Sequence, residues 1–425
     1  MDHWLSRAAQ IHPERVALAT SEGELSHREL EQLALGAAGA LRERGVAPGD
    51  RVALALPAGR GFVAALHGCM MAGAIAIPID LRLSPQDRAA RAAGAVVSVE
   101  EPLRGAPRSP PEPLWPERTA VVMHTSGTTA APRPVALSYG NLFAGALGSA
   151  VALGLDQRER WLCPMPLVHV GGLSIVVRSA IYATTAVLHE RFDVAAVAGA
   201  LMDAGERITL VSLVPTMLSR LLDAGLSDPP TLRWALLGGG PIAPALVRRA
   251  AEAGIEVATT YGMTEASSQI ATLGWPLPGV EVEIEDDGEL LVRGPTVAVG
   301  AVAPDGWLHT GDLGAFDARG RLTITGRKAD TIITGGENVA PAEVEAVLLE
   351  HPAVADAGVH ARPDPQWGEA VVATVALREG RRADERELLA HCSNRLAGFK
   401  VPKAISFAEA LPRTASGKLL RRRLG

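Results

Sequence analysis

Residues 207–237 read RITLVSLVPTMLSRLLDAGLSDPPTLRWALL, where two short apolar runs flank an amphipathic segment. The runs Arg207–Val214 and Trp234–Leu237 predict buried strands, and the spacing of apolar residues in Thr216–Ala224 predicts a helix between them. A strand–helix–strand order is typical of a unit in which the two strands are parallel.

The same alternation continues in both directions, over residues 25–270. Ser138 and Asp193 precede two further predicted helices and are suitable N-caps. We therefore predict an α/β fold whose large domain consists of layered, largely parallel sheets with helices. The further strands are Arg51–Pro57, Ala74–Asp80 and Ala120–His124, and the further helices are Phe62–Met71, Asn141–Leu153 and Val194–Ala204.

The pattern changes after Gly274. Val280–Glu285 and Glu289–Arg293 alternate apolar and charged residues around Asp287-Gly288, which predicts a hairpin. We place a boundary at Gly326-Arg327, between a large domain of residues 1–326 and a small α+β domain of residues 327–425. The elements predicted for the small domain are the helix Pro341–Glu350, the strand Glu369–Leu377 and the helix Asp384–Leu396.

Composition excludes several classes of protein. The chain has 425 residues, 48% hydrophobic and 21% charged, which indicates a globular rather than a disordered protein. Its net charge of −6 argues against a nucleic-acid binder. We find no apolar segment that predicts a signal peptide or membrane insertion. Because Cys69, Cys163 and Cys392 lie far apart, we expect a reduced, cytoplasmic protein. The sequence leaves a homo-oligomer open.

A hydroxyl-rich loop follows the strand predicted at Ala120–His124. Residues 124–135 read HTSGTTAAPRPV. Backbone N–H groups and hydroxyls of such a loop can bind a phosphate, and Arg133 adds charge. Taken alone, the string is equally well interpreted as a surface turn rich in serine and threonine. The candidate nucleotide-binding residues in this loop are Thr125, Ser126, Gly127, Thr128, Thr129 and Arg133.

Four further motifs follow in order: TYGMTE at 260–265, LHTGD at 308–312, GR at 326–327 leading to GGEN at 335–338, and PRTASGK at 412–418. Together with the loop they resemble the adenylate-forming superfamily, which contains acyl- and aryl-CoA ligases, adenylation domains of peptide synthetases and luciferases. The resemblance covers nearly the whole chain. It implies an AMP-forming ligase that uses ATP, Mg²⁺ and coenzyme A, with a small carboxylic acid as substrate.

The resemblance also implies roles for single residues. Glu265 would be the Mg²⁺ carboxylate, a hard oxygen ligand that suits this ion, and Thr264 would contact the α-phosphate. Tyr261 would stack on the adenine. Asp312 would bind the ribose hydroxyls, and Arg327 would add a ribose or phosphate contact. Each residue alone also has an ordinary interpretation, such as a half-buried tyrosine or a turn aspartate.

In the resembling family, a lysine in the position of Lys418 reaches the reacting carboxylate and is withdrawn when the small domain rotates. Gly335 and Gly336 resemble the loop that the pantetheine passes, where glycine permits close approach. Lys418 could instead belong to a basic tail with Arg421–Arg423, a run that we expect to be a solvated chain end.

Three positions depart from the family pattern. Ala130 replaces a glycine and Arg133 a lysine in the phosphate loop, which changes the backbone freedom and the geometry of the charge. Ala329 occupies the usual hinge position, which weakens the transfer of a hinge role to it. Because Glu265 and Lys418 are retained, we still expect activity.

Residues 165–182, MPLVHVGGLSIVVRSAIY, are most similar to the o-succinylbenzoate–CoA ligases of menaquinone biosynthesis. This resemblance implies that Arg178 binds the carboxylate that does not react, since a guanidinium suits bidentate binding. The alternative is an exposed helix residue. His169 would line the pocket or gate the thiol channel, or be an ordinary core histidine. The predicted acyl-site residues are Arg178, Gly238, Gly239, Gly240 and Thr260.

Three alternatives remain at this stage. The first is the same chemistry on another aryl, fatty or malonic acid, for which Arg178 would have no carboxylate to bind. The second is an adenylation domain that loads a carrier protein, for which we find no acidic residue to receive an amino group. The third is a catalytically silent, nucleotide-binding scaffold, which the departures at Ala130 and Arg133 favour.

Overall fold

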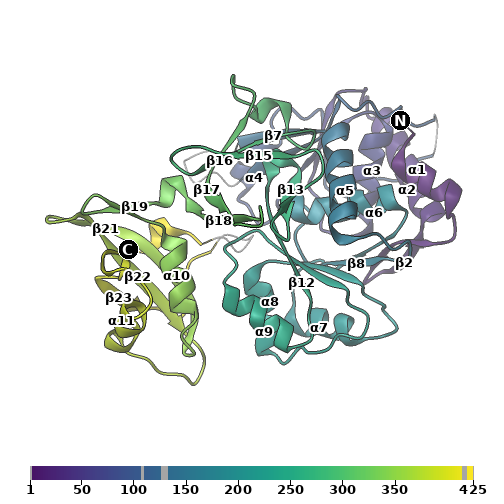
Figure 1. Ribbon diagram of the computed structural model, residues 1–425. Coiled ribbons are helices and arrows are strands. Elements are labelled where there is room, and N and C mark those ends of the chain that lie inside the picture. The colour runs from purple at the N-terminus through teal and green to yellow at the C-terminus, as the bar shows by residue number, and fades with distance from the viewer. Residues whose placement is uncertain (1, 107–109, 126–132, 414–418, 425) are drawn as a thin grey trace.

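The computed structural model describes residues 2–106, 110–125, 133–413 and 419–424. Over these ranges the strands form four sheets (Figure 1). Two large sheets with helices make up the right-hand part of the view, and a smaller group of elements lies on the left. The predicted α/β class is confirmed.

A nine-stranded sheet, ordered β14-β13-β12-β11-β10-β8-β9-β1-β2, forms the centre of the large part. The six neighbouring strands β12, β11, β10, β8, β9 and β1 pair in parallel. The outer strands β2, β13 and β14 pair antiparallel. The bounds are β1 (Val16–Thr20), β2 (Gly23–Ser26), β8 (Arg160–Cys163), β9 (Thr185–Leu188), β10 (Leu210–Leu213), β11 (Trp234–Leu237), β12 (Val257–Met263), β13 (Ser268–Thr272) and β14 (Trp275–Pro276).

A second, five-stranded sheet has the order β5-β3-β4-β6-β7 and is parallel except for the pair β6–β7. That pair is a hairpin whose connection is the predicted phosphate loop. The bounds are β3 (Arg51–Leu54), β4 (Ile75–Pro78), β5 (Val97–Val99), β6 (Thr119–Thr125) and β7 (Arg133–Ser138).

Helices cover these sheets in layers. One hydrophobic core gathers residues of α1, α2, α3, α5 and α6 with both sheets, and a second joins α7, α8 and α9 to the nine-stranded sheet. Ser138 and Asp193 cap α5 and α7, as predicted. The bounds are α1 (Trp4–Ile11), α2 (His27–Glu43), α3 (Arg60–Met71), α4 (Pro85–Arg91), α5 (Tyr139–Leu153), α6 (Val170–Tyr182), α7 (Val194–Met202), α8 (Pro215–Asp223) and α9 (Pro244–Glu252).

The remaining strands form two antiparallel-rich sheets. The first is β15-β16-β17-β18, which contains the predicted hairpin, and the second is β20-β19-β22-β21 with β23 beside β22. The bounds are β15 (Glu281–Ile284), β16 (Glu289–Arg293), β17 (Leu308–Phe316), β18 (Leu322–Arg327), β19 (Ile332–Thr334), β20 (Glu337–Val339), β21 (Val354–Asp364), β22 (Gly368–Leu377), β23 (Ala404–Phe407), α10 (Pro341–Leu349) and α11 (Glu385–Ser393).

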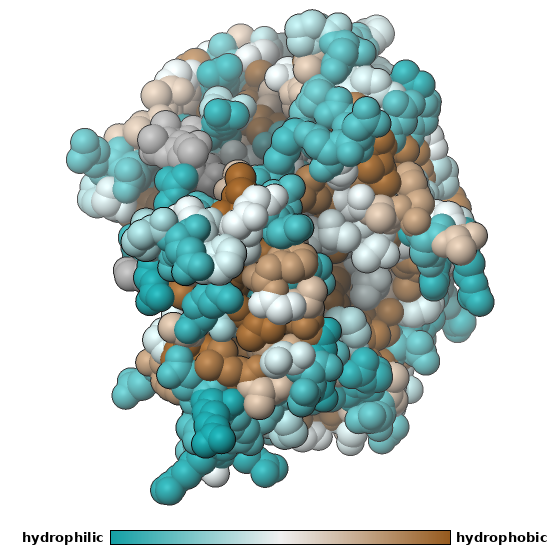
Figure 2. All heavy atoms as spheres, turned by 60° about the vertical axis from the view of Figure 1, so that its left-hand side comes forward, coloured by the Kyte–Doolittle hydropathy of each residue, from teal (hydrophilic) through white to brown (hydrophobic). Residues whose placement is uncertain are grey.

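The left-hand group in Figure 1 has a hydrophobic core of its own between α10, α11 and their sheet. This separate core supports the small domain, whose boundary at residue 327 stays a prediction. Figure 2 brings this group forward and shows mostly hydrophilic residues at the rim of that face. Apolar residues also show on that face, inside the hydrophilic rim (Figure 2).

The strands predicted at Arg51–Pro57, Ala74–Asp80 and Arg207–Val214 are each shorter in the structure. β10 begins at Leu210, whereas the apolar pattern placed its start at Arg207. Arg207 has a φ of 51° and therefore cannot belong to an extended strand.

The three cysteines are free and buried. Burial raises the pKa of Cys69 and of Cys163 to about 12, so both thiols stay protonated. No helix among the described residues is both long and apolar enough to cross a membrane.

Buried histidines should make the large part sensitive to acid. The rings of His3 and His67 lie 6.3 Å apart, and burial lowers the pKa of His3 to about 3 and that of His67 to about 4. Both are neutral when folded but take up a proton near pH 6.5 when unfolded. Stability is therefore complete above pH 6.5 and falls below it. We expect a loss of about 2 kcal/mol per histidine by pH 5.

Urea unfolding of the wild type and of His67→Asn at pH 7.0 and pH 5.0 measures this effect. The variant should lose less stability between the two pH values than the wild type. An identical loss in both proteins would show that His67 does not carry the acid sensitivity.

Candidate active site

Three of the predicted nucleotide-binding residues meet at the middle of β17, around Asp312. The hydroxyl of Tyr261, on β12, donates to Oδ2 of Asp312 at 2.9 Å, and Nε of Arg327, on β18, donates to Oδ1 at 2.8 Å. Asp312 and Arg327 are partners in the register of β17 and β18. The pairing of these two strands thus brings together residues of motifs that are far apart in sequence.

Burial tunes this cluster. It raises the pKa of Tyr261, and the charge of Asp312 raises it further, so the phenol stays a hydrogen-bond donor. Burial alone would lower the pKa of Arg327, but the carboxylate of Asp312 outweighs that effect and raises it. Asp312 also has its backbone fixed, because its N–H donates to Oγ1 of Thr310 at 3.0 Å. The cluster therefore holds a carboxylate in a defined orientation.

Thr264 and Glu265 lie in the short 3₁₀ helix η1 (Thr264–Ala266) that directly follows β12. Glu265 is half-buried, and its carboxylate makes no hydrogen bond or ion pair with any residue in the described ranges. A metal that keeps several waters and bridges phosphates needs only one or two carboxylates. The donor set of Glu265 therefore fits Mg²⁺.

The turn after η1 is strained. Ser267 and Ser268 have φ values of 54° and 97°, which non-glycine residues rarely adopt. Gly262 is required before this turn, because a Cβ there would lie 1.6 Å from the carbonyl oxygen of Ser268. Such strain is typical of functional sites, where the surrounding structure compensates for it.

The phosphate loop is described only at its two ends. Thr125 pairs with Arg133 across β6 and β7, and Oγ1 of Thr125 donates to the carbonyl of Arg133 at 3.4 Å. The hairpin thus brings the ends of the loop together, with Arg133 exposed. The predicted residues Ser126, Gly127, Thr128, Thr129 and Lys418, and the departure at Ala130, lie outside the described residues.

The predicted acyl-site glycines follow the carboxyl end of β11. A Cβ at Gly238 would lie 2.7 Å from Cγ2 of Thr260, on β12. Gly239 has a φ of 78°, and a Cβ there would lie 3.3 Å from Cγ1 of Val214. Gly240 comes next, near Pro215. The carboxyl ends of parallel strands are the usual ligand sites of α/β sheets, and the three glycines follow such an end, that of β11.

Arg178 is buried, with 2% of its surface exposed, so the alternative of an exposed helix residue is wrong. It lies on α6, with its guanidinium 5.8 Å from the centre of the Trp161 ring. It forms no ion pair with the described carboxylates, and its Nη2 has no hydrogen-bond partner among the described residues. Burial lowers the pKa of Arg178. A buried cation without a carboxylate is unfavourable unless a ligand supplies one.

The neighbour of Arg178 was not predicted from the sequence. Trp161 is the second residue of β8, and its Nε1 donates to Oγ of Ser212 at 2.9 Å. This places the pair near the amino end of β8, whereas the acyl-site glycines follow the carboxyl end of β11. No described contact joins Arg178 to those glycines.

His169 lies at the N-cap position of α6 and is half-buried. Its pKa is lowered by burial and by the nearby charge of Arg82, which Asp80 only partly offsets. The ring is therefore neutral at pH 7. Its Nε2 is buried and has no partner within the described ranges. This nitrogen is therefore available to form a hydrogen bond with a ligand.

Comparison with known proteins agrees with this geometry. The model of the AMP-binding enzyme family matches residues 5–99 and 90–301, and that of the AMP-binding enzyme C-terminal domain matches residues 343–418. The chain belongs to the AMP-binding enzyme family.

Similar proteins are known in detail. The 2-succinylbenzoate–CoA ligase of Bacillus licheniformis is 38% identical over 480 residues, which cover 100% of both chains. The o-succinylbenzoate CoA synthetase of Bacillus subtilis, solved with the acyl-adenylate intermediate OSB-AMP, has a TM-score of 0.91 at 35% identity and covers 100% of this chain and 98% of that one. The same synthetase with ATP and magnesium ion has a TM-score of 0.90 at 35% identity, and 99% of each chain is covered.

Gly335 and Gly336 of this AMP-binding enzyme form the turn between β19 and β20, with φ values of 59° and 86°. A Cβ at Gly335 would lie 2.8 Å from the ring of Trp367, so this position requires glycine. The turn belongs to the left-hand group in Figure 1, apart from β12. The structure thus does not bring the predicted pantetheine glycines to the Tyr261–Asp312 cluster.

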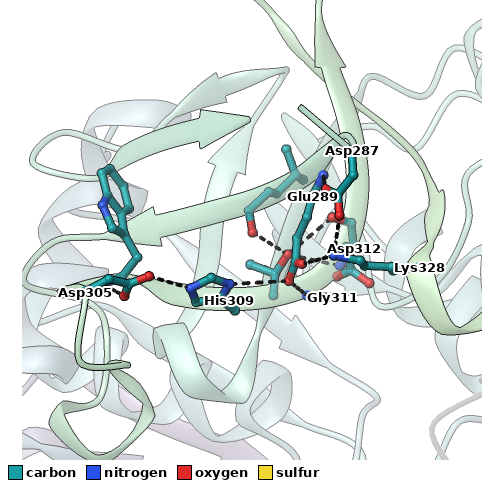
Figure 3. A network of polar contacts seen from close by, with 10 residues as sticks. Asp287, Glu289, Asp305, His309, Gly311, Asp312 and Lys328 are labelled. Carbon is teal, nitrogen blue, oxygen red and sulfur yellow. Dashed lines mark hydrogen bonds and ion pairs between the residues drawn. The ribbon is translucent and has the colours of Figure 1, made fainter. Parts of the chain in front are cut away.

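A polar network behind Asp312 was missed from the sequence (Figure 3). Glu289, buried on β16, accepts from the N–H of Gly311 at 2.9 Å and from Nζ of Lys328 at 2.8 Å. Burial opposes its ionisation, but these bonds hold the pKa of Glu289 below its usual value. Lys328 also pairs with Asp287 at 2.5 Å. The network fixes both the turn before Asp312 and the residue after Arg327.

Replacing Asp312 by alanine should weaken ATP binding specifically. The change removes the acceptor of both Tyr261 and Arg327, and hydrogen bonds to a charged group contribute about 1.5–3 kcal/mol. We expect the KM for ATP to rise by roughly ten- to a hundredfold, with the KM for the acid nearly unchanged. Initial rates against each substrate measure this. Asp305→Asn, a change in the exposed turn before β17, is the control. Equal rises for ATP and acid would contradict the assignment.

Proposed function

We propose that this chain is an ATP- and Mg²⁺-dependent, AMP-forming acid–CoA ligase that converts o-succinylbenzoate to o-succinylbenzoyl-CoA in menaquinone biosynthesis. The observation that carries the proposal is the similarity over the full length to 2-succinylbenzoate–CoA ligases, together with the fold shared with the OSB-AMP complex. The three buried free thiols suit the reducing cytoplasm, where we place the enzyme.

In the first half-reaction, the carboxylate of the acid attacks the α-phosphorus of ATP, and the bond to the leaving pyrophosphate breaks. Tyr261, Asp312 and Arg327 would orient the nucleoside, and Thr264 would contact the α-phosphate. Glu265 would hold Mg²⁺, which neutralises phosphate charge when bound. Lys418 would reach the reacting oxygens, where a mobile ammonium offsets the developing charge.

In the second half-reaction, the thiol of coenzyme A attacks the acyl carbon and AMP leaves. His169, neutral and with an unpartnered Nε2 at the start of α6, would contact the acid or the thiol. Gly335 and Gly336 would let the pantetheine pass closely. Since these glycines lie in the small group of elements, the proposal requires residues 327–425 to rotate as a mobile domain between the two half-reactions.

The direct test is pyrophosphate release from ATP and Mg²⁺ with a panel of acids, with and without coenzyme A. The panel contains o-succinylbenzoate, benzoate, a medium-chain fatty acid and malonate. We expect release with o-succinylbenzoate alone and consumption of coenzyme A. Release with another acid would keep the ligase chemistry and reject this substrate. Silence with all acids, while ATP still binds, would favour the scaffold alternative.

Arg178→Ala should raise the KM for o-succinylbenzoate much more than that for ATP. The guanidinium is a buried cation that suits the second carboxylate, and a lost charged contact corresponds to roughly a tenfold or larger effect. Arg178→Lys, which keeps the charge, is the matched control and should lose less. Thermal melting monitors the loss of the contact with Trp161. If both KM values change equally, or only stability falls, Arg178 supports Trp161 and does not bind the acid.

A further inference from the structure

The basic tail is not the solvated chain end that the sequence predicted. Arg421, in the 3₁₀ helix η5 (Arg421–Arg423), keeps only 18% of its side chain exposed. Its neighbours Arg422 and Arg423 are exposed, as expected. One arginine of three therefore has a structural position that the others lack.

Arg421 joins two acidic residues from different elements. Its Nε pairs with Oδ2 of Asp330 at 3.1 Å, and its Nη2 with Oε2 of Glu345 at 3.1 Å, while Nη1 contacts Oε1 of Glu345. Glu345, on α10, is 5% exposed and also accepts from the N–H of Val359 at 2.8 Å. A bidentate arginine–carboxylate pair in such a buried place is directional as well as strong. It fixes Arg421 to α10 and to the residues just after β18.

An apolar contact holds the same segment against β21. A Cβ at Gly358 would lie 2.7 Å from Leu424 and 2.9 Å from Leu419, and Leu411 is also near. The glycine thus provides the space in which leucines from both sides of residues 414–418 pack. Leu420 donates its N–H to the carbonyl of Pro412 at 2.9 Å, which joins the two sides directly.

The amino-terminal side has an arginine of its own. Arg413 pairs with Asp356, on β21, at 2.6 and 3.0 Å, and forms an isolated bridge with Leu419. Residue 413 is therefore anchored to β21, and residue 421 to α10 and Asp330. Both ends of the segment 414–418 are fixed to one small sheet and its helix.

We propose that Arg421 is a positioning residue for the adenylation half-reaction. Its ion pairs with Glu345 and Asp330 fix the chain three residues after Lys418, and so determine where that lysine begins its reach. The inference rests on the proposed function, in which Lys418 acts only during adenylation. Misplacement of a reacting group by about 1 Å can reduce the rate by about a hundredfold.

The test separates the two half-reactions. Acid-dependent exchange of pyrophosphate into ATP measures adenylation, and supplied acyl-adenylate with coenzyme A measures thioester formation. Arg421→Ala should slow adenylation by roughly ten- to a hundredfold, through kcat rather than the KM for ATP. Thioester formation should stay within about twofold of the wild type, which is the pattern expected of Lys418→Ala, though weaker.

Arg422→Ala is the matched control, because it removes the same charge from the adjacent, exposed position; both half-reactions should remain unchanged. Arg421→Lys should catalyse adenylation faster than Arg421→Ala but more slowly than the wild type, because it keeps the charge and loses the bidentate contact. Asp330→Asn removes one ion pair of Arg421 and leaves the pair with Glu345 in place. It should also slow adenylation more than thioester formation, but by less than Arg421→Ala. It serves as the test if Arg421→Ala does not fold.

Equal losses in both half-reactions for Arg421→Ala and Asp330→Asn would overturn the inference, because a merely structural role does not distinguish them. So would an effect of Arg422→Ala as large as that of Arg421→Ala. If the wild type shows no exchange with any acid of the panel, the proposed function itself fails, and the inference fails with it.

Discussion

The ion pair between Asp312 and Arg327 links the candidate nucleotide site to the start of the small group of elements. Asp312 ends the LHTGD motif on β17, and Arg327 ends β18, one residue before η3 (Lys328–Asp330). Tyr261 donates to the same carboxylate from the nine-stranded sheet. A single buried carboxylate therefore aligns three sheet segments. Because an unpaired charge at this depth would be unfavourable, the pair constrains where β18 ends.

Other buried charges differ in whether the protein itself supplies a partner. Glu289 and Glu345 are each satisfied by a cation and a backbone N–H. Arg178 has the ring of Trp161 and the side chain of Tyr182 near it, and no ion pair with a described carboxylate. The ion pairs of Glu289 and Glu345 stabilise the fold. A buried cation without a counter-ion, such as Arg178, suits a ligand anion, and the stem of its side chain also packs against apolar neighbours.

The carboxyl ends of β10, β11 and β12 give the candidate acyl site its shape. Gly238 permits Thr260 to approach, and the strained turn at Ser267 and Ser268 follows η1, which contains Glu265. Gly238 thus directly follows β11 and Glu265 lies just after β12, two neighbouring strands of one sheet. His169, a neutral ring at the start of α6, lies near the charges of Arg82 and Asp80. The close-packed glycines after β11 thus lie one strand away from Tyr261, on β12.

The sequence by itself determined the α/β class, the hairpin at β15–β16 and the motif residues Tyr261, Glu265 and Asp312, because apolar periodicity and short motifs are local properties. It missed β21, whose polar residues obscure the pattern, and it misjudged Arg421. Only the tertiary structure decided which charges are buried. Arg421 meets Glu345 across 76 residues, and Asp312 meets Tyr261 across 51. Burial of a charge depends on partners that only the fold brings near.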